Sequence, residues 1–161
     1  MKNRVTVERK SDRELVVTRT FDAPARLIFE AWSKPELFRR WWLPRSMGMT
    51  LVSYEADVRT GGNYRLEISH QGSKPMAFFG TYLEVTPHSR IVWTNEESPD
   101  GPVTTVTLEE KGGKTVLVLS ELHPSKEALD AAGTGALDAM GETFGQLEEL
   151  IAELSAGSGR S

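Results

Sequence analysis

The C-terminal part of the chain, from about residue 125, shows the spacing of an amphipathic helix. From Leu137 to Leu154, apolar residues recur at steps of three and four, and polar residues such as Gln146 occupy the opposite face. This pattern predicts one long helix over about residues 125–153, with a weak point at 133–135, where two glycines lie. A helix with a whole apolar face must pack against another part of the chain.

Most of the chain before this helix has the alternation of β-strands. The predicted strands cover approximately residues 15–21, 49–58, 63–70, 76–86, 90–97, 103–110 and 114–122. The turns between the last six are short and rich in Gly, Pro and Asp, which favours hairpins and therefore antiparallel neighbours. Two short helices, about 24–32 and 35–40, follow the first strand. Residues 3–9 alternate only weakly between apolar and polar side chains, which is compatible with a short additional strand or arm.

This order of elements predicts an α+β fold in which a curved, seven-stranded antiparallel sheet wraps around the C-terminal helix. The two short helices close one end. The length of 161 residues fits a single domain with a substantial core. We assign residues 1–154 to that domain and expect the small, polar tail 155–161 to be disordered.

Composition narrows the class of protein. The net charge of −4 argues against a nucleic-acid partner, and the absence of cysteine excludes disulfides and thiolate chemistry. No stretch has the pattern of a signal peptide or the length of a membrane span. We therefore expect a cytoplasmic protein without membrane insertion. A homodimer is compatible with a domain of this size, although no sequence feature locates an interface.

Several short stretches, taken together, resemble those of a known superfamily. They are Arg19–Pro24, Ala31–Leu37, Arg40–Pro44, Asp57–Arg65, Phe79–Tyr82, Gly112–Thr115, Pro124–Ala128 and Met140–Leu147. Their order and spacing resemble the START-like or SRPBCC superfamily, whose helix-grip fold is also that of the birch pollen allergen. Within it, the chain is similar to the branch named after the C-terminal domain of the heat-shock-protein-90 ATPase activator. The resemblance covers about residues 13–154 and implies a ligand-binding fold.

Aromatic and methionine side chains are the candidates for lining a cavity, because they are large and adaptable; the same properties suit a filled core. Alternation groups Tyr64 with Leu66, and Phe78 with Tyr82, without showing which face of the sheet is concave. The candidate ligand-binding residues are Trp41, Trp42, Met49, Tyr64, Leu66, Phe78, Tyr82, Trp93, Met140 and Phe144. Asn95 joins the tyrosines as a polar group that would orient a ligand.

Candidates for catalysis or metal binding are weak. The three histidines, His70, His88 and His123, lack metal-ligand spacing and are expected on the surface or in turns. Strand carboxylates such as Glu121 are expected to be solvated; Glu84 shares the parity of Tyr82 and could point inward. Phosphate-loop and nucleophile-elbow motifs are absent. The sequence thus predicts no catalytic residue, no metal and no cofactor.

Three functions remain open. A non-catalytic protein that binds an apolar or amphipathic small molecule predicts a cavity closed by Trp41 and Trp42, with no buried titratable group. A polyketide cyclase or aromatase-like enzyme predicts an acid, histidine or tyrosine with a perturbed pKa inside the cavity. A chaperone-linked or self-associating interaction module predicts a filled core and an exposed apolar patch. We favour small-molecule binding, because no catalytic set is clustered in the sequence.

Overall fold

Eight strands form one antiparallel sheet in the computed structural model, which describes residues 6–43, 46, 48–70, 72–96, 101–132 and 140–158. They are β1 (Thr6–Arg9), β2 (Glu14–Phe21), β3 (Met49–Ala56), β4 (Asn63–His70), β5 (Met76–Thr86), β6 (Arg90–Thr94), β7 (Val103–Lys111) and β8 (Lys114–Leu122). Their order is β1-β2-β8-β7-β6-β5-β4-β3, so β2 pairs with the last strand. The prediction of seven strands is one short, because the weakly alternating N-terminal segment pairs with β2 as β1.

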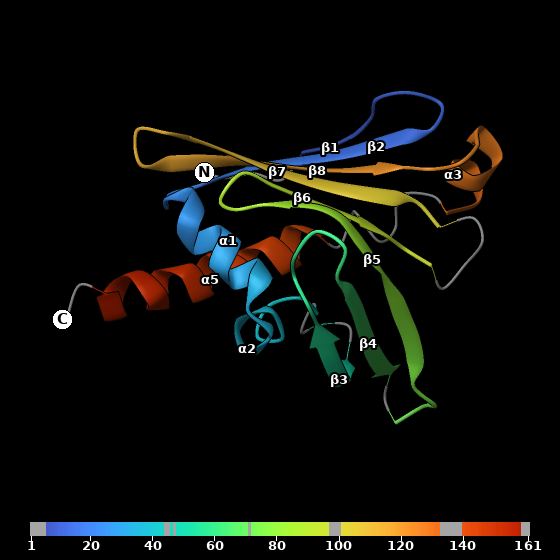
Figure 1. The fold of residues 1–161 in the computed structure, drawn as a ribbon, viewed down its shortest axis with the longest axis horizontal. Coiled ribbons are helices and arrows are strands. Elements are labelled where there is room, and N and C mark those ends of the chain that lie inside the picture. Colours follow the sequence, from blue (N-terminus) through green and yellow to red (C-terminus); the bar gives the residue numbers. More distant parts are fainter. Residues whose placement is uncertain are drawn as a thin grey trace.

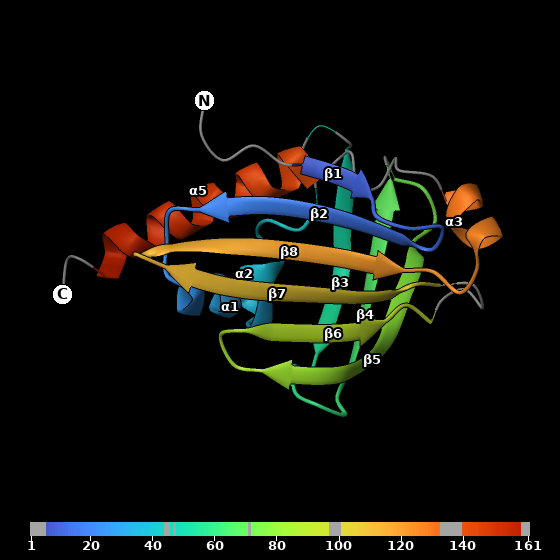
Figure 2. The ribbon, with the colours of Figure 1, turned by 90° about the horizontal axis from the view of Figure 1, so that it is seen from above.

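The sheet is strongly curved. Figure 2 shows β3 and β4 running across the direction of β2, β8 and β7. The pairing register shifts between Leu51 and Ser53 on β3, and between Tyr82 and Glu84 on β5. Such bulges bend a strand and increase its twist, and here they produce a concave face.

Helices lie over that concave face and at one end of the sheet. They are α1 (Ala25–Ser33), α2 (Pro35–Phe38), α3 (Lys126–Ala132) and α5 (Met140–Ser158). Figure 1 shows α1, α2 and α5 on one side of the sheet, whereas α3 lies at the far end of β8. In the described part of residues 125–153, the predicted single helix is therefore replaced by α3 and α5, which lie apart. Leu137 and the glycines at 133–135 lie outside the described residues.

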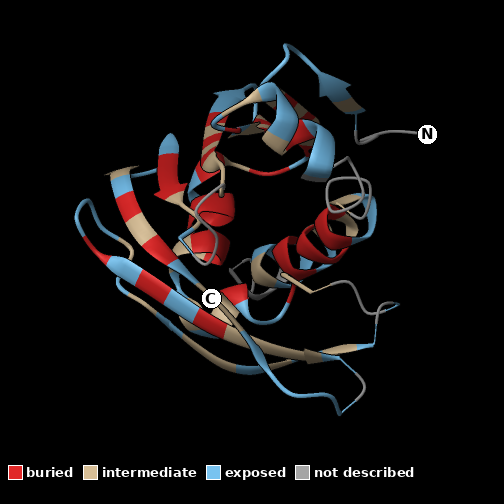
Figure 3. Cartoon of the chain, turned by 90° about the vertical axis from the view of Figure 1, so that its right-hand side faces the viewer, coloured by how far each residue is buried: buried red, intermediate tan, exposed pale blue. Residues whose placement is uncertain are grey.

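Helix α5 begins at Met140 and continues through Ser158. It thus includes four residues that were expected in the C-terminal tail, while residues 159–161 lie outside the described part of the chain. The apolar stripe packs as predicted, since Phe144, Leu147 and Ile151 belong to the buried core. Figure 3 shows buried residues on both the helices and the strands of the sheet.

Gln146 departs from the predicted polar face of this helix. Its side chain is buried, and Nε2 donates hydrogen bonds to the backbone oxygens of Trp41 (3.0 Å) and Leu43 (2.8 Å). Because both amide hydrogens are used, the side chain can be buried at little cost. Gln146 thereby fastens the segment after α2 to α5.

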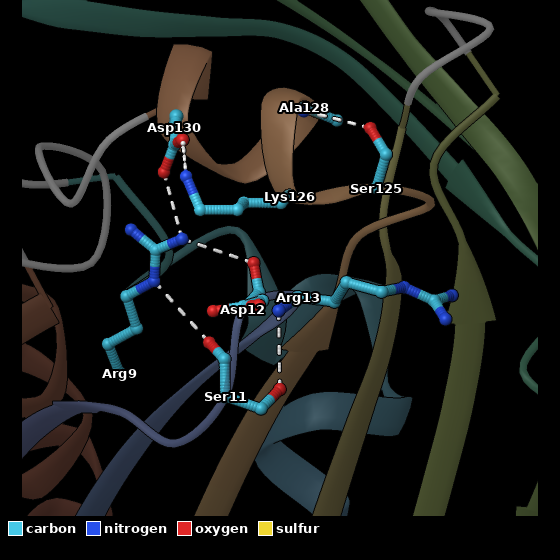
Figure 4. A network of polar contacts seen from close by, with 8 residues as sticks. All are labelled: Arg9, Ser11, Asp12, Arg13, Ser125, Lys126, Ala128 and Asp130. Carbon is cyan, nitrogen blue, oxygen red and sulfur yellow. Dashed lines mark hydrogen bonds and ion pairs between the residues drawn. The ribbon is translucent and has the colours of Figure 1, made fainter.

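Ion pairs hold α3 against the turn between β1 and β2. Asp130 lies 2.8 Å from both the Lys126 ammonium and the Arg9 guanidinium (Figure 4). Arg9 also donates to the backbone oxygen of Asp12 at 3.1 Å. Leu129, next to Asp130 in α3, is buried in the core. The short helix is thus held both by ion pairs and by apolar packing.

Candidate ligand-binding cavity

A cavity of about 360 Å³ lies between the concave face of the sheet and the helices. Its volume falls within the range of about 300–1,000 Å³ that is usual for small-molecule sites. Its wall consists of Trp32, Phe38, Trp42, Tyr54, Tyr64, Leu66, Ile68, Phe78, Tyr82, Trp93, Asn95, Pro102, Thr104, Leu119, Glu121, His123 and Met140. Most of these side chains are apolar or aromatic. The other polar ones, Asn95, Thr104, Glu121 and His123, gather where β6 and β8 end and β7 begins.

Most of the candidate residues lie in this wall. They are Trp42, Tyr64, Leu66, Phe78, Tyr82, Trp93 and Met140. Tyr64 and Leu66 on β4 face the same cavity as Phe78 and Tyr82 on β5, which identifies these as the concave faces of their strands. Whether these residues bind a ligand stays a prediction.

Three candidates lie elsewhere. The Trp41 ring is fully buried, and its Nε1 donates to the backbone oxygen of Ala31 at 3.0 Å. Phe144 is also fully buried and packs edge-on against Phe21, with 6.0 Å between ring centroids. Met49 is the first residue of β3 and is not part of the wall. The expectation that Trp41 and Trp42 together close the cavity is therefore wrong; only Trp42 borders it.

Aromatic rings form a continuous surface on the helical side of the cavity. Phe38 stacks between Trp42 and Tyr54, with centroid distances of 4.9 and 4.8 Å. Trp32 contacts both Trp42 and Trp93 at 6.2 Å. Neither Trp32 nor Phe38 is among the ligand-binding candidates expected from the sequence. Such a surface suits a flat, apolar ligand, because aromatic rings prefer offset stacking or edge-to-face contact.

Burial keeps the hydroxyl groups of Tyr54 and Tyr82 in their neutral form. Burial raises the pKa of Tyr54 to about 12. Burial also raises the pKa of Tyr82 far above its usual value, helped by the neighbouring Tyr54 hydroxyl, with which it shares a hydrogen bond. Tyr64 donates to the backbone oxygen of Thr94 at 2.7 Å. Tyr54 and Tyr82 can therefore donate or accept hydrogen bonds, but they are not bases near neutral pH.

Asn95 secures the edge of the cavity between β6 and β7. Its Nδ2 donates to the backbone oxygen of Pro102 (2.7 Å) and to Oγ1 of Thr104 (3.0 Å). Its Oδ1 lies 3.3 Å from the Tyr64 hydroxyl. Because these bonds are made within the protein, we interpret Asn95 as a residue that shapes the wall.

Glu121 and His123 correct the expectation that strand carboxylates and histidines are solvated. Both border the cavity, and only 3% of the His123 side chain is exposed. Nε2 of His123 lies 3.6 Å from Oε1 of Glu121 and finds no hydrogen-bond partner among the described residues. Burial raises the pKa of Glu121 and lowers the pKa of His123. Burial thus favours the neutral form of each group.

The backbone explains why His123 points inward. Its N–H donates to the backbone oxygen of Arg13 at 2.7 Å, and its own oxygen accepts from Arg13 Nε at 2.9 Å. These bonds extend the pairing of β2 and β8 by one residue, so the alternation that turns Leu119 and Glu121 toward the cavity continues to His123.

The other candidates for chemistry lie on the surface. The bulge after Tyr82 turns Glu84 outward, where it pairs with Arg90 at 3.1 Å. His70 and His88 are exposed, as expected. Among the described residues, no cluster of His, Asp and Glu could hold a metal ion, and no helix is long and apolar enough to span a membrane.

Comparison with known proteins agrees with this architecture. Residues 22–152 match the family model described as Activator of Hsp90 ATPase homolog 1-like protein. The chain belongs to this family. The resemblance to the SRPBCC superfamily is thereby confirmed. Among curated proteins, none matches the sequence of this member of the family.

Solved structures of bacterial proteins share the fold. A Rhodobacter sphaeroides protein is 21% identical, with a TM-score of 0.84 over 93% of this chain and 99% of that one. A Nitrosomonas europaea protein is also 21% identical, with a TM-score of 0.80 over 91% and 98% of the two chains. A Staphylococcus epidermidis protein is 28% identical, with a TM-score of 0.74 over 92% and 94%. These likenesses confirm the helix-grip fold, and the names of the three proteins specify no ligand or reaction.

Proposed function

We propose that this member of the Activator of Hsp90 ATPase homolog 1-like family binds an apolar or amphipathic small molecule in the cavity between sheet and helices. The observation that carries the proposal is the cavity of about 360 Å³ with its aromatic wall. Burial of apolar ligand surface would supply affinity, at roughly 25 cal/mol per Å². Domains of the SRPBCC superfamily typically bind small apolar ligands, which supports the same conclusion.

A cyclase-like enzyme is the second candidate, and Glu121 with His123 is the observation that favours it. An enzyme of this kind predicts a titratable group inside the cavity, whereas a purely passive binding protein predicts none. A neutral carboxyl group beside a neutral imidazole could donate and accept a proton at a bound carbonyl compound. Turnover requires binding first, so a test of binding serves both candidates.

The interaction module has less support. It predicts a filled core, whereas the structure contains a cavity. Its other expectation was an exposed apolar patch, and Val52, Met76 and Leu83 are exposed strand residues that could contribute to one. The interaction module becomes the favoured function only if no small molecule binds.

Thermal unfolding with a panel of lipids, flavonoids and polyketide-like aromatics tests the proposal. A ligand at 100 times its dissociation constant should stabilise the fold by about 2.7 kcal/mol, which raises Tm by several degrees. Leu66→Phe adds a ring inside the cavity, and Leu83→Phe adds the same ring on the exposed outer face of the sheet. We expect the ligand to raise Tm in Leu83→Phe as in the unmodified protein, and to cause no rise in Leu66→Phe.

Two results would count against the proposal. A shift that is the same in both variants would place the ligand outside the cavity. No shift across the panel with the unmodified protein would favour a protein partner instead.

A further inference from the structure

The polar end of the cavity holds a buried atom that lacks a bond within the protein. Nε2 of His123 has no hydrogen-bond partner among the described residues, although the side chain is almost entirely buried. Buried polar atoms are nearly always bonded, so an exception at a cavity wall indicates a missing partner from outside the chain. This observation is independent of the size and apolar character of the cavity.

The distance between the two groups suggests the shape of that partner. Oε1 of Glu121 and Nε2 of His123 are 3.6 Å apart, which is too long for a direct hydrogen bond. A single oxygen atom placed about 2.8 Å from each would complete a triangle with normal hydrogen-bond lengths. The gap therefore fits one bridging oxygen.

We propose that Glu121 and His123 form a two-point anchor for one hydroxyl group of an otherwise apolar ligand, such as a phenol or an alcohol. This inference rests on the proposed function and adds the chemical class of the ligand. A hydroxyl both donates and accepts at the same oxygen. It can donate to the Glu121 carboxylate while accepting from Nε2–H, or accept from a protonated Glu121 while donating to Nε2. Both protonation patterns give two hydrogen bonds.

The residues around Glu121 are uncharged and favour a ligand that is mainly apolar. The residues paired with Glu121 on the two neighbouring strands are Leu15 and Thr104, and neither is charged. The Thr104 hydroxyl already accepts a hydrogen bond from Asn95. Leu119, on the same face of β8, continues the wall beside the carboxyl group. A ligand hydroxyl would thus be the polar end of a mainly apolar molecule.

The backbone of His123 is held from outside the cavity. Arg13 bonds both backbone groups of His123. The turn that carries Arg13 also contains Asp12, whose backbone oxygen accepts from Arg9, and Arg9 pairs with Asp130 on α3 (Figure 4). An anchor of this kind needs a fixed geometry, because a hydrogen bond weakens steeply when it is misaligned.

Three bicyclic probes that differ only in one substituent test the anchor. The probe 2-naphthol can donate and accept, 2-methoxynaphthalene can only accept, and naphthalene can do neither. We expect the protein to bind 2-naphthol about tenfold more tightly than the other two, because an ether cannot supply the donated bond. Affinity is measured by quenching of tryptophan emission.

Matched variants locate the effect. In Glu121→Met and His123→Phe, we expect the preference for 2-naphthol to fall to about twofold or less, while naphthalene binds as before. Glu109→Met changes an exposed carboxylate on β7 and should keep the full preference. If one anchor variant fails to fold, the other still decides the result. In addition, the imidazole nitrogen resonances of His123, but not of His70 and His88, should move when 2-naphthol is added to the unmodified protein.

The outcomes separate the two proposals. If all three probes bind with equal affinity, or if the preference persists in both anchor variants, the anchor is wrong and the cavity proposal stands. If none of the probes binds, the proposed function fails for ligands of this size, and the anchor fails with it.

Discussion

Nη2 of Arg19 on β2 lies 2.6 Å from Oε1 of Glu148 on α5, and this ion pair joins the sheet to the helix. The Arg19 side chain is only 10% exposed, whereas that of Glu148 is 36% exposed. The guanidinium carbon also lies 5.2 Å from the centre of the Phe21 ring. A cation is thus buried beneath α5, with its carboxylate partner nearer to solvent.

This arrangement predicts that replacing Glu148 lowers the free energy of unfolding more than replacing Arg19. Glu148→Met leaves a buried cation without its carboxylate and should lower the free energy of unfolding by about 1–2 kcal/mol, less than for a fully buried pair because Glu148 is partly exposed. Arg19→Met removes the cation together with its desolvation cost and should lower stability by about 1 kcal/mol or less. Urea unfolding of both variants measures the difference. Equal losses, or a larger loss for Arg19→Met, would contradict this account.

Gly80 allows β5 to approach β6 closely. A Cβ atom at this position would lie 2.1 Å from the backbone oxygen of Thr94. Gly80→Ala should therefore destabilise the protein by about 2–4 kcal/mol, because backbone would have to move. Gly145→Ala is the control: apart from its chain neighbours and the adjoining backbone of α5, no described atom lies within 4 Å of its Cβ position. Alanine also favours the interior of α5 by about 0.5–1 kcal/mol. Denaturant midpoints should move in opposite directions for the two variants.

The buried tyrosines predict a loss of stability at alkaline pH. The pKa of Tyr54 rises from 10.0 to about 12 in the folded protein, and the pKa of Tyr82 is raised further by burial and by Tyr54. A group whose pKa is raised on folding contributes its full stabilisation below the pKa of the unfolded state. That contribution is lost as pH rises from about 10 through the folded value. In a pH titration, tyrosinate absorbance should therefore appear at higher pH in the folded protein than in the urea-unfolded chain, and Tyr54→Phe should reduce this difference. Ionisation of all tyrosines near pH 10 in the folded protein would contradict the prediction.

Glu121 predicts a second pH dependence, at lower pH. Burial raises the pKa of Glu121 in the folded protein, so folding favours its protonated form. The stabilisation from this group is therefore complete below the pKa of the unfolded chain, about 4.3, and is lost as pH rises through the pKa of the folded protein. Glu121→Gln removes the charge and should gain stability relative to the unmodified protein between about pH 4 and pH 7, by up to about 1 kcal/mol. Glu109→Gln, at an exposed site, should show a flat difference over the same range. A flat difference for Glu121→Gln as well would show that its carboxyl group is solvated.

Strand positions could be predicted from the sequence because hairpin turns constrain both ends of each strand. β4, β5 and β8 have the predicted bounds, and each is flanked by a short turn with glycine or proline. The C-terminal helix could not be divided correctly. Helical periodicity gives the same pattern for one helix as for two that share a phase, so the separation of α3 from α5 depends on tertiary contacts such as the buried Leu129.

The cavity wall was predictable only in part. Alternation groups residues by face but does not identify the concave face, and Glu121 and His123 were therefore wrongly expected in contact with solvent. One signal was available: on β8 the larger residues Leu117 and Leu119 share the parity of Glu121, while the other face carries valines. Trp41 and Trp42 could not be told apart from the sequence. Two identical neighbours in the sequence point to different places, because the Trp41 indole bonds to Ala31 on α1.

All four tryptophans of the chain belong to a single aromatic cluster. The Trp32 ring lies 4.9 Å from Trp41 and 6.2 Å from both Trp42 and Trp93. Indoles this close share their electronic excitation, so they should act as one chromophore with a strong near-ultraviolet circular dichroism signal. Three of the four rings border the cavity, so that optical signal originates where a ligand would enter. The protein thus contains a built-in spectroscopic probe, and occupancy of the cavity can be followed without attaching a label.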